Sequence, residues 1–184
     1  MILGLSGLAG SGKTTLAQHL VENHGYVRLS FAAPIRHALL AMGIPECFLT
    51  DAKSSQVPRV GKTGRYLMQT LGTEWARRTI NQNFWLYLMD QKVEGLQGQN
   101  IVIDDVRFDN EARYIRAKKG FILKIVRGNT QLDEPYDPDH VSEEGIDSDL
   151  VNYIIENSGS VASAVDKMDK ISCRLLSTTS LLMT

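Results

Sequence analysis

The sequence predicts an α/β fold in which a parallel sheet of five strands is flanked by helices. Short apolar runs alternate along the chain with segments whose apolar residues recur at helical spacing. Parallel neighbours need long crossover connections, and the helical segments have that length. The 184 residues are a usual size for one globular domain. We therefore expect a single domain over residues 1–184.

The five expected strands are short and apolar. They cover residues 2–5, 26–30, 101–103, 121–126 and 153–155. Helices are expected over residues 13–23, 64–79, 83–95 and 110–118, and from Pro34 and Ser160 onward. Residues 43–63 are expected to form an irregular surface loop, and the tail from Ser177 to be frayed. The helical segment between the second and third strands exceeds a plain crossover, so residues 31–95 are expected to form an insert that covers a substrate.

Composition and charge exclude several classes of protein. Twenty basic and twenty-one acidic side chains give a formal net charge of −1, so no global field attracts nucleic acid or an anionic membrane. Cys47 and Cys173 form no CxxC pair, which disfavours a zinc ribbon or a disulfide framework. No stretch approaches the ~20 apolar residues of a membrane span. We expect a cytoplasmic protein that acts on small molecules, without nucleic-acid or membrane partners.

A glycine-rich loop follows the first expected strand and precedes the first expected helix. Residues 7–14 read Gly-Leu-Ala-Gly-Ser-Gly-Lys-Thr and match the phosphate-binding pattern GxxxxGK[ST] at every fixed position. In such a loop, backbone amides and a helix N-terminus bind phosphate, the lysine reaches the β and γ phosphates, and the threonine can ligate magnesium. The pattern predicts a three-layer P-loop NTPase fold that uses ATP and Mg²⁺. The residues expected to bind the nucleotide are Gly7, Ala9, Gly10, Ser11, Gly12, Lys13, Thr14 and Thr15.

Two aspartates follow the third expected strand. P-loop proteins place a second magnesium anchor at the end of an apolar strand. Asp104 directly follows residues 101–103 and is expected in the magnesium shell together with Thr14. Asp105 is expected to contact the acceptor, and capping of the next turn is an equal alternative for it.

Motifs that the chain lacks narrow the class of P-loop protein. The sequence has neither the Asn-Lys-x-Asp and Asp-x-x-Gly motifs of regulatory GTPases nor the Leu-Ser-Gly-Gly-Gln signature of transporter ATPases. Kinases with an anionic acceptor place arginines between the two phosphates. Arg36 and Arg107 follow the carboxyl ends of expected strands, where open sheets bind ligands, whereas Arg65 could equally be solvated. The residues expected to carry catalysis are Lys13, Arg36, Arg77, Arg107 and Asp104.

Taken together, these segments resemble the deoxynucleoside monophosphate kinases of bacteriophages and prophages, which are relatives of adenylate kinase. Besides residues 7–14, the resemblance rests on residues 30–36, 64–74, 104–111 and 157–160, and it covers most of the chain. It implies transfer of the ATP γ-phosphate to a deoxynucleoside 5′-monophosphate, with magnesium required. A phage-encoded chain would act in the cytoplasm of its host.

The resemblance also implies where the two substrates bind. The loop before the last helix, with Asn157 and Gly159, would lie beside the adenine of ATP, unless it only caps that helix. Residues 127–140 form a short segment where adenylate kinase has a long lid. Arg113, Arg116 or Arg127 could then clamp the phosphates, and the sequence does not choose among them. Residues 140–143 also resemble the family, without an assigned role. The residues implied for the acceptor are Phe31, Arg36, Arg65, Gln69, Gly72, Thr73, Arg77 and Asp105.

Two other functions stay open at the level of the sequence. A P-loop kinase of another small phosphorylated metabolite, in the manner of phosphomevalonate or dephospho-coenzyme A kinases, would use the same donor site. A non-catalytic nucleotide-binding switch would hydrolyse ATP slowly, without dependence on an acceptor. The accepted bases are not readable from the sequence. The oligomeric state is also open, with a homodimer as one alternative.

Overall fold

Five parallel strands form one sheet in the order β2-β3-β1-β4-β5. The strands are β1 (Ile2–Ser6), β2 (Val27–Leu29), β3 (Ile101–Val106), β4 (Phe121–Val126) and β5 (Tyr153–Glu156). All four pairings of neighbouring strands are parallel, and β1 lies at the centre of the sheet. The predicted five-stranded parallel sheet is therefore confirmed.

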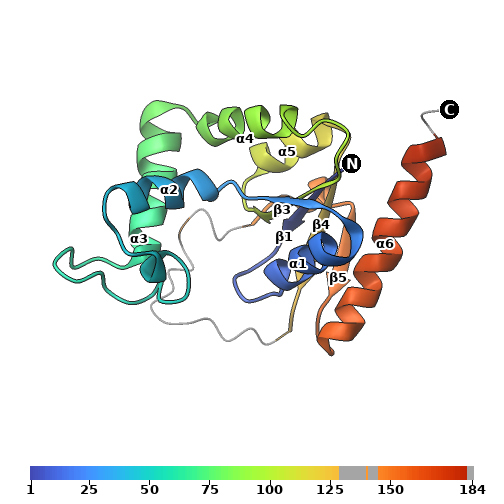
Figure 1. Ribbon diagram of the computed structural model, residues 1–184, viewed down its shortest axis with the longest axis horizontal. Helices are drawn as coiled ribbons and strands as arrows, with labels where there is room; N and C mark the ends of the chain where they lie inside the picture. Colours follow the sequence, from blue (N-terminus) through green and yellow to red (C-terminus); the bar gives the residue numbers. More distant parts are fainter. Residues whose placement is uncertain (129–139, 141–144, 182–184) are drawn as a thin grey trace. The chain divides into compact units, whose positions relative to one another are not determined.

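The computed structural model describes residues 1–128, 140 and 145–181 (Figure 1). Of these, residues 1–29, 96–128 and 145–181 form one unit, which contains the whole sheet. Residues 30–95 and residue 140 belong to a second, helical unit. The second unit nearly coincides with the predicted insert over residues 31–95, and the monophosphate-binding role of that insert stays a prediction. The predicted lid-like segment over residues 127–140 lies mostly outside the described residues.

The first unit has helices on both faces of its sheet. These helices are α1 (Lys13–His24), α5 (Asp109–Ala117) and α6 (Val161–Leu181). Side chains alternate along a strand, and Leu5 of β1 packs in one buried cluster with Leu20 of α1 and Met168 of α6. The neighbouring Gly4 faces the other way, because a Cβ built on it would lie 2.7 Å from Cδ1 of Ile115 in α5. The predicted three-layer arrangement follows from these contacts.

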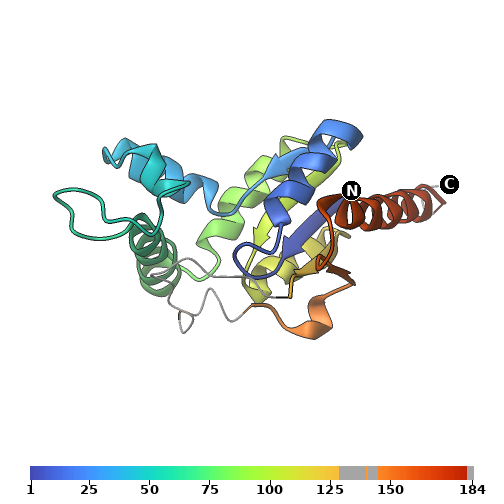
Figure 2. The same cartoon turned by 90° about the horizontal axis from the view of Figure 1, so that it is seen from below.

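Helix α6 is longer and better anchored than the sequence suggests. It runs without interruption to Leu181 (Figure 2), so the predicted frayed tail from Ser177 is wrong as far as that residue. Leu175 is buried in the core, which extends apolar packing towards the end of the helix. The buried Ser172 hydroxyl hydrogen-bonds the Tyr26 hydroxyl at 2.9 Å, and burial raises the pKa of Tyr26. Among the helices in the described part of the chain, none combines the length and apolar character needed to cross a bilayer.

The second unit is built from helices α2 (Ala33–Ala41), η1 (Glu46–Leu49), α3 (Gly64–Gln69), η2 (Thr70–Ile80) and α4 (Phe84–Glu94). The predicted helical stretch over residues 64–79 is observed, but its second part, η2, is a π-helix. Its wider turns are visible at its end, where the Asn81 amide donates to the Ala76 carbonyl, five residues back, at 2.8 Å. The buried indole of Trp85 donates to the Gly72 carbonyl at 2.8 Å. A donor from outside a helix stabilises such departures from α-helical bonding, and π-turns often occur at functional sites.

Candidate active site

The glycine-rich loop joins β1 to α1 in a backbone conformation that requires glycine. Gly7 has φ 137° and Gly12 has φ 100°, values that other L-residues rarely adopt. A Cβ on Gly7 would lie 2.3 Å from the carbonyl oxygen of Ile125, and a Cβ on Gly12 would lie 2.5 Å from Nδ2 of Asn157. Both positions therefore exclude a side chain on steric grounds as well.

The side chain of Lys13 folds back along this loop. Its Nζ donates hydrogen bonds to the carbonyl oxygens of Gly7 and Leu8, both at 2.7 Å, and lies 3.5 Å from Oγ of Ser11. Only 9% of the residue is exposed. The ammonium group is thus held at the loop that opens α1, where helix N-terminal amides and a positive charge together favour an anion.

Asn157 contacts the same loop from the end of β5. Its side-chain Nδ2 donates to the Ser11 carbonyl at 2.9 Å, and its backbone amide donates to the Val126 carbonyl at 2.7 Å. Asn157 is buried, whereas Gly159 is exposed in the turn before α6. The structure therefore gives Asn157 a role in shaping the phosphate loop. Contact of Asn157 and Gly159 with adenine stays a prediction.

Asp104 lies within β3, so the predicted end of this strand at residue 103 is wrong. Gly4 of β1 pairs with Ile103 and Ser6 pairs with Val106, with a shift of register between the two pairs. Asp104 and Asp105 consequently share the space opposite a single residue of β1. An irregularity of this kind bends a strand and redirects its side chains, and it is common beside active sites. Asp104 is 6% exposed and Asp105 is half-buried.

Arg28 of β2 is the partner of this buried carboxylate. Its Nε and one terminal nitrogen donate to Oδ2 of Asp104, at 2.9 and 2.5 Å. A buried charge is costly without such a partner, and the ion pair with Arg28 offsets the burial of the Asp104 carboxylate. Arg28 is not among the site residues predicted from the sequence. The feature that could have indicated it is a single arginine within the short apolar strand that precedes the predicted insert.

The turn from β3 into α5 is fixed by the carboxylate of Glu111. This side chain is 2% exposed, and its Oε2 accepts hydrogen bonds from the backbone amides of Arg107 at 2.8 Å and Phe108 at 3.1 Å. The arrangement is a helix cap in which a side chain of the first turn binds the amides that precede the helix. It positions the backbone of Arg107 directly after β3.

Replacing Glu111 with alanine is expected to lower the free energy of unfolding by about 2–3 kcal/mol, because two amides lose a charged acceptor in a buried position. Urea denaturation followed by circular dichroism measures this change. Glu94→Ala is the matched control, since Glu94 is exposed at the end of α4. A Glu111→Ala variant within about 0.5 kcal/mol of the wild type would contradict this role.

The predicted acceptor residues of the second unit lie on several helices. Arg36 of α2 is half-buried and donates to Oγ of Ser30 at 3.0 Å, and Arg77 of η2 donates to the Gln82 carbonyl at 3.2 Å. Arg65 and Gln69 are half-buried on α3, Gly72 and Thr73 are buried in η2, and Phe31 is buried before α2. The continuous stretch of α3 and η2 thus carries five of these residues. Their contact with an acceptor stays a prediction.

One residue of the segment 140–143 lies within the described part of the chain. His140 places Nε2 3.3 Å from Oε1 of Glu74 in η2. Residues 141–143 lie outside the described residues.

The predicted nucleotide residues Thr14 and Thr15 are exposed on the first turn of α1.

Comparison with known proteins identifies the family of this chain. The profile of the deoxynucleotide monophosphate kinase family matches residues 61–168. A protein of Acanthamoeba polyphaga mimivirus assigned by name to the same kinases is 31% identical over 193 residues, which cover 93% of this chain and 99% of the relative. The chain belongs to the deoxynucleotide monophosphate kinase family. The predicted family is confirmed, and membership in it supports a kinase and does not favour a non-catalytic switch.

Two phage proteins of the deoxynucleotide monophosphate kinase class match a shorter part of the chain. The deoxynucleoside-5′-monophosphate kinase of Escherichia phage T5 is 25% identical over 116 residues, which cover 61% of this chain and 46% of that enzyme. The deoxynucleotide monophosphate kinase of Escherichia phage RB69 is 26% identical over 110 residues, or 58% of this chain and 43% of that enzyme. The matched segments therefore span less than half of either phage enzyme.

Solved structures support the fold of this deoxynucleotide monophosphate kinase family member. A protein of Thermus thermophilus has a TM-score of 0.55 at 16% identity, covering 95% of this chain and 97% of the other. A protein of Chloroflexus aurantiacus assigned by name to the kinases has a TM-score of 0.54 at 12% identity, covering 96% of both chains. At this level of identity the likeness concerns the fold alone. It agrees with the predicted P-loop kinase fold.

Proposed function

We propose that this protein transfers the γ-phosphate of ATP to a deoxynucleoside 5′-monophosphate, giving the diphosphate and ADP. The proposal rests on the phosphate loop, in which the ammonium of Lys13 is hydrogen-bonded to the carbonyls of Gly7 and Leu8. The family to which the chain belongs supports the same reaction. Preference for deoxyribose rests on the family alone. The reaction would take place in the cytoplasm, that of the host if the chain is virus-encoded.

The oxygen atoms of Thr14 and Asp104 are of the kind that binds a magnesium ion. Thr14 offers a hydroxyl oxygen on the first turn of α1, and Asp104 offers a carboxylate on β3. Magnesium takes oxygen ligands and keeps several of its waters, so a small set of protein oxygens is sufficient. Thr14 and Asp104 would hold the ion, with Arg28 orienting Asp104. When bound, the ion would neutralise charge on the β and γ phosphates.

The side chains of this chain supply charge and alignment. Phosphoryl transfer requires the donor and acceptor oxygens in line and neutralisation of the charge on the transferred group. Lys13 would stabilise the donor phosphates, and the planar guanidinium groups of Arg36, Arg77 and Arg107 would hold the acceptor phosphate through paired hydrogen bonds. The acceptor phosphate is already ionised at neutral pH, so the reaction needs no general base.

Acceptor profiling tests the proposed function. Purified protein, ATP and Mg²⁺ are incubated with each common deoxynucleoside and nucleoside monophosphate and with non-nucleotide phosphorylated metabolites, and ADP and the phosphorylated product are quantified. We expect ADP release that depends on at least one deoxynucleoside monophosphate and matches diphosphate formation one to one. Activity confined to non-nucleotide acceptors, or slow ATP hydrolysis that no acceptor changes, would overturn the proposal.

Two adjacent arginines of η2 provide a matched pair for testing the acceptor site. Arg77 is half-buried, whereas Arg78 is exposed and its NH1 lies 3.9 Å from Oε1 of Glu74. Arg77→Ala is expected to lower kcat/KM for the acceptor by roughly 10- to 100-fold, the effect of losing a charge-assisted hydrogen bond. Arg78→Ala should change it less than about twofold. Equal effects of the two substitutions in steady-state kinetics would refute the role of Arg77.

A further inference from the structure

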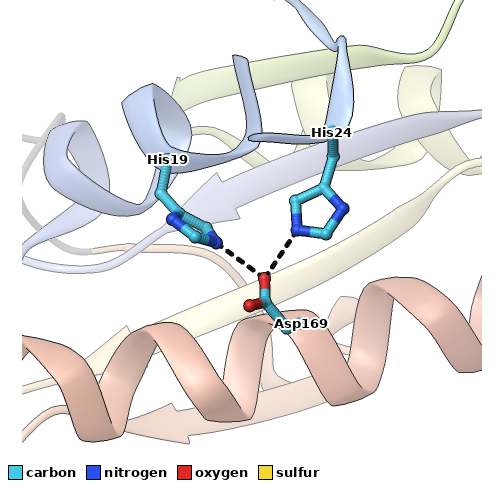
Figure 3. A group of neighbouring side chains, drawn as sticks. All are labelled: His19, His24 and Asp169. Atoms are coloured by element: carbon cyan, nitrogen blue, oxygen red, sulfur yellow. Dashed lines mark hydrogen bonds and ion pairs between the residues drawn. The ribbon is translucent and has the colours of Figure 1, made fainter. Parts of the chain in front are cut away.

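Three side chains with metal-ligating atoms converge between α1 and α6, as Figure 3 shows. Nε2 of His19 lies 2.7 Å from Oδ1 of Asp169, and Nε2 of His24 lies 2.8 Å from the same oxygen. Both histidines belong to α1, and Asp169 belongs to α6. The three ligand atoms all lie within 4.8 Å of one another. The proposed kinase reaction uses none of these residues.

We propose that His19, His24 and Asp169 form a binding site for a divalent transition-metal ion of the zinc class. Zinc binds imidazole nitrogen and carboxylate oxygen at about 2.0–2.2 Å in tetrahedral geometry, which separates neighbouring ligand atoms by roughly 3.3 Å. To admit the ion, the two N···O distances of 2.7 and 2.8 Å would widen by about half an ångström, and the two imidazole nitrogens, which lie within 4.8 Å of each other, would adopt the same separation of roughly 3.3 Å. Three protein ligands leave the fourth position for water.

The carboxylate of Asp169 is in a suitable chemical state. Burial alone would raise the pKa of Asp169, but the hydrogen bonds from His19 and His24 and the charges of these rings hold that pKa below its ordinary value. The carboxylate is therefore ionised at neutral pH, as a metal ligand must be. The side chains of the three residues are 18%, 24% and 35% exposed, so a hydrated ion can reach them from solvent.

Asn23 provides an outer contact of the kind that metal-binding histidines have. Its side-chain nitrogen lies 3.1 Å from Nδ1 of His19 and donates to the His19 carbonyl at 3.2 Å. A metal on Nε2 requires a proton on Nδ1, so metal binding would require the Asn23 amide to rotate, present its oxygen to that proton and release the His19 carbonyl. Such outer contacts fix the orientation of the ring and strengthen binding.

Donor chemistry separates this site from the one proposed at the phosphate loop. Thr14 and Asp104 offer only oxygen atoms, which suit magnesium, whereas a site with two imidazoles favours zinc and its neighbours in the transition series. The ion at His19, His24 and Asp169 would have a structural role, because it would link α1 to α6. Asn157 already links the loop at the start of α1 to the segment before α6. The ion would add a second link, near the C-terminal end of α1.

Zinc titration of metal-free protein without nucleotide tests the proposal. The starting protein carries Cys47→Ser and Cys173→Ser, because both thiols are exposed and could bind zinc themselves. Calorimetry at pH 7.5 is expected to show one ion per chain, and Co²⁺ should give the visible absorption bands of a tetrahedral complex. Zinc at about 100 times its Kd should raise Tm by roughly 5–10 °C, because it stabilises only the folded state.

Matched variants assign the ion to the site. His24→Gln and Asp169→Asn preserve size and hydrogen bonding and should weaken zinc binding by more than about 100-fold, since even outer contacts account for 10- to 100-fold. His37→Ala is the control, because His37 is an exposed histidine of α2. Melting curves without metal establish that each variant is folded. The proposal is wrong if the starting protein binds no zinc saturably, or if His24→Gln and Asp169→Asn bind it as tightly as the control.

Discussion

Replacing Lys13 with alanine is expected to reduce kcat/KM of the kinase reaction by roughly 10²–10³-fold, the usual effect of losing one preorganised donor to the transition state. The ammonium is held at the loop by the Gly7 and Leu8 carbonyls, so its position is set before substrate binds. Its charge would be closest to the phosphate oxygens on which negative charge develops. A residue so placed contributes more to the transition state than to folding.

The measurement for Lys13→Ala is steady-state ADP release with the best acceptor of the wild-type enzyme. Lys92→Ala serves as the control, because Lys92 is exposed near the end of α4 and should leave turnover unchanged. Thermal unfolding should show that Lys13→Ala remains folded. Turnover above about a tenth of the wild-type value in the folded variant would contradict a catalytic role for Lys13.

The features that the sequence predicted correctly are those encoded locally. Residues 7–14 are contiguous, so spacing alone identifies the phosphate loop. The strand over residues 121–126 is predicted with its observed bounds, because it is a short apolar run interrupted only by Lys124. The family resemblance and the P-loop pattern together were sufficient to predict the fold and the kinase class.

The features that the sequence did not reveal depend on residues far apart in the chain. Arg28 and Asp104 are 76 positions apart, and they meet only because β2 and β3 are neighbours in the sheet. The contact of His19 with Asp169 spans 150 positions and requires α6 to pack against α1. Neither strand order nor helix packing is specified by local periodicity. The contacts of Arg28 and of the two histidines therefore needed three-dimensional structure.

The π-helical geometry of η2 escaped prediction for a different reason. Residues 64–79 have the apolar spacing of an ordinary amphipathic helix, and periodicity does not distinguish four-residue from five-residue hydrogen bonding over so short a stretch. The indole of Trp85, which binds the Gly72 carbonyl, comes from the next helix. A contact from outside the segment therefore accompanies the π-helical geometry, and local periodicity does not report such a contact.

Asp104→Asn is expected to lower kcat by about 100-fold and to raise the Mg²⁺ concentration needed for half-maximal activity. Asparagine keeps the size of the side chain but removes the negative charge that is proposed to bind the ion, and a metal that neutralises phosphate charge contributes several kcal/mol to the transition state. The activity of both proteins is measured across a range of free Mg²⁺ at saturating ATP. An unchanged Mg²⁺ requirement in the variant would remove Asp104 from the metal site.

The ion pair with Arg28 offers an alternative explanation for any loss of activity in Asp104→Asn. Arg28→Ala and the double variant distinguish the two explanations. If Asp104 served only to pair with Arg28, then Arg28→Ala would impair activity as much as Asp104→Asn, and the double variant would be no worse than either. If Asp104 holds magnesium, Arg28→Ala lowers stability because a buried carboxylate loses its partner, yet it retains most of the Mg²⁺ response. The carboxylate, and not the ion pair, then determines metal affinity.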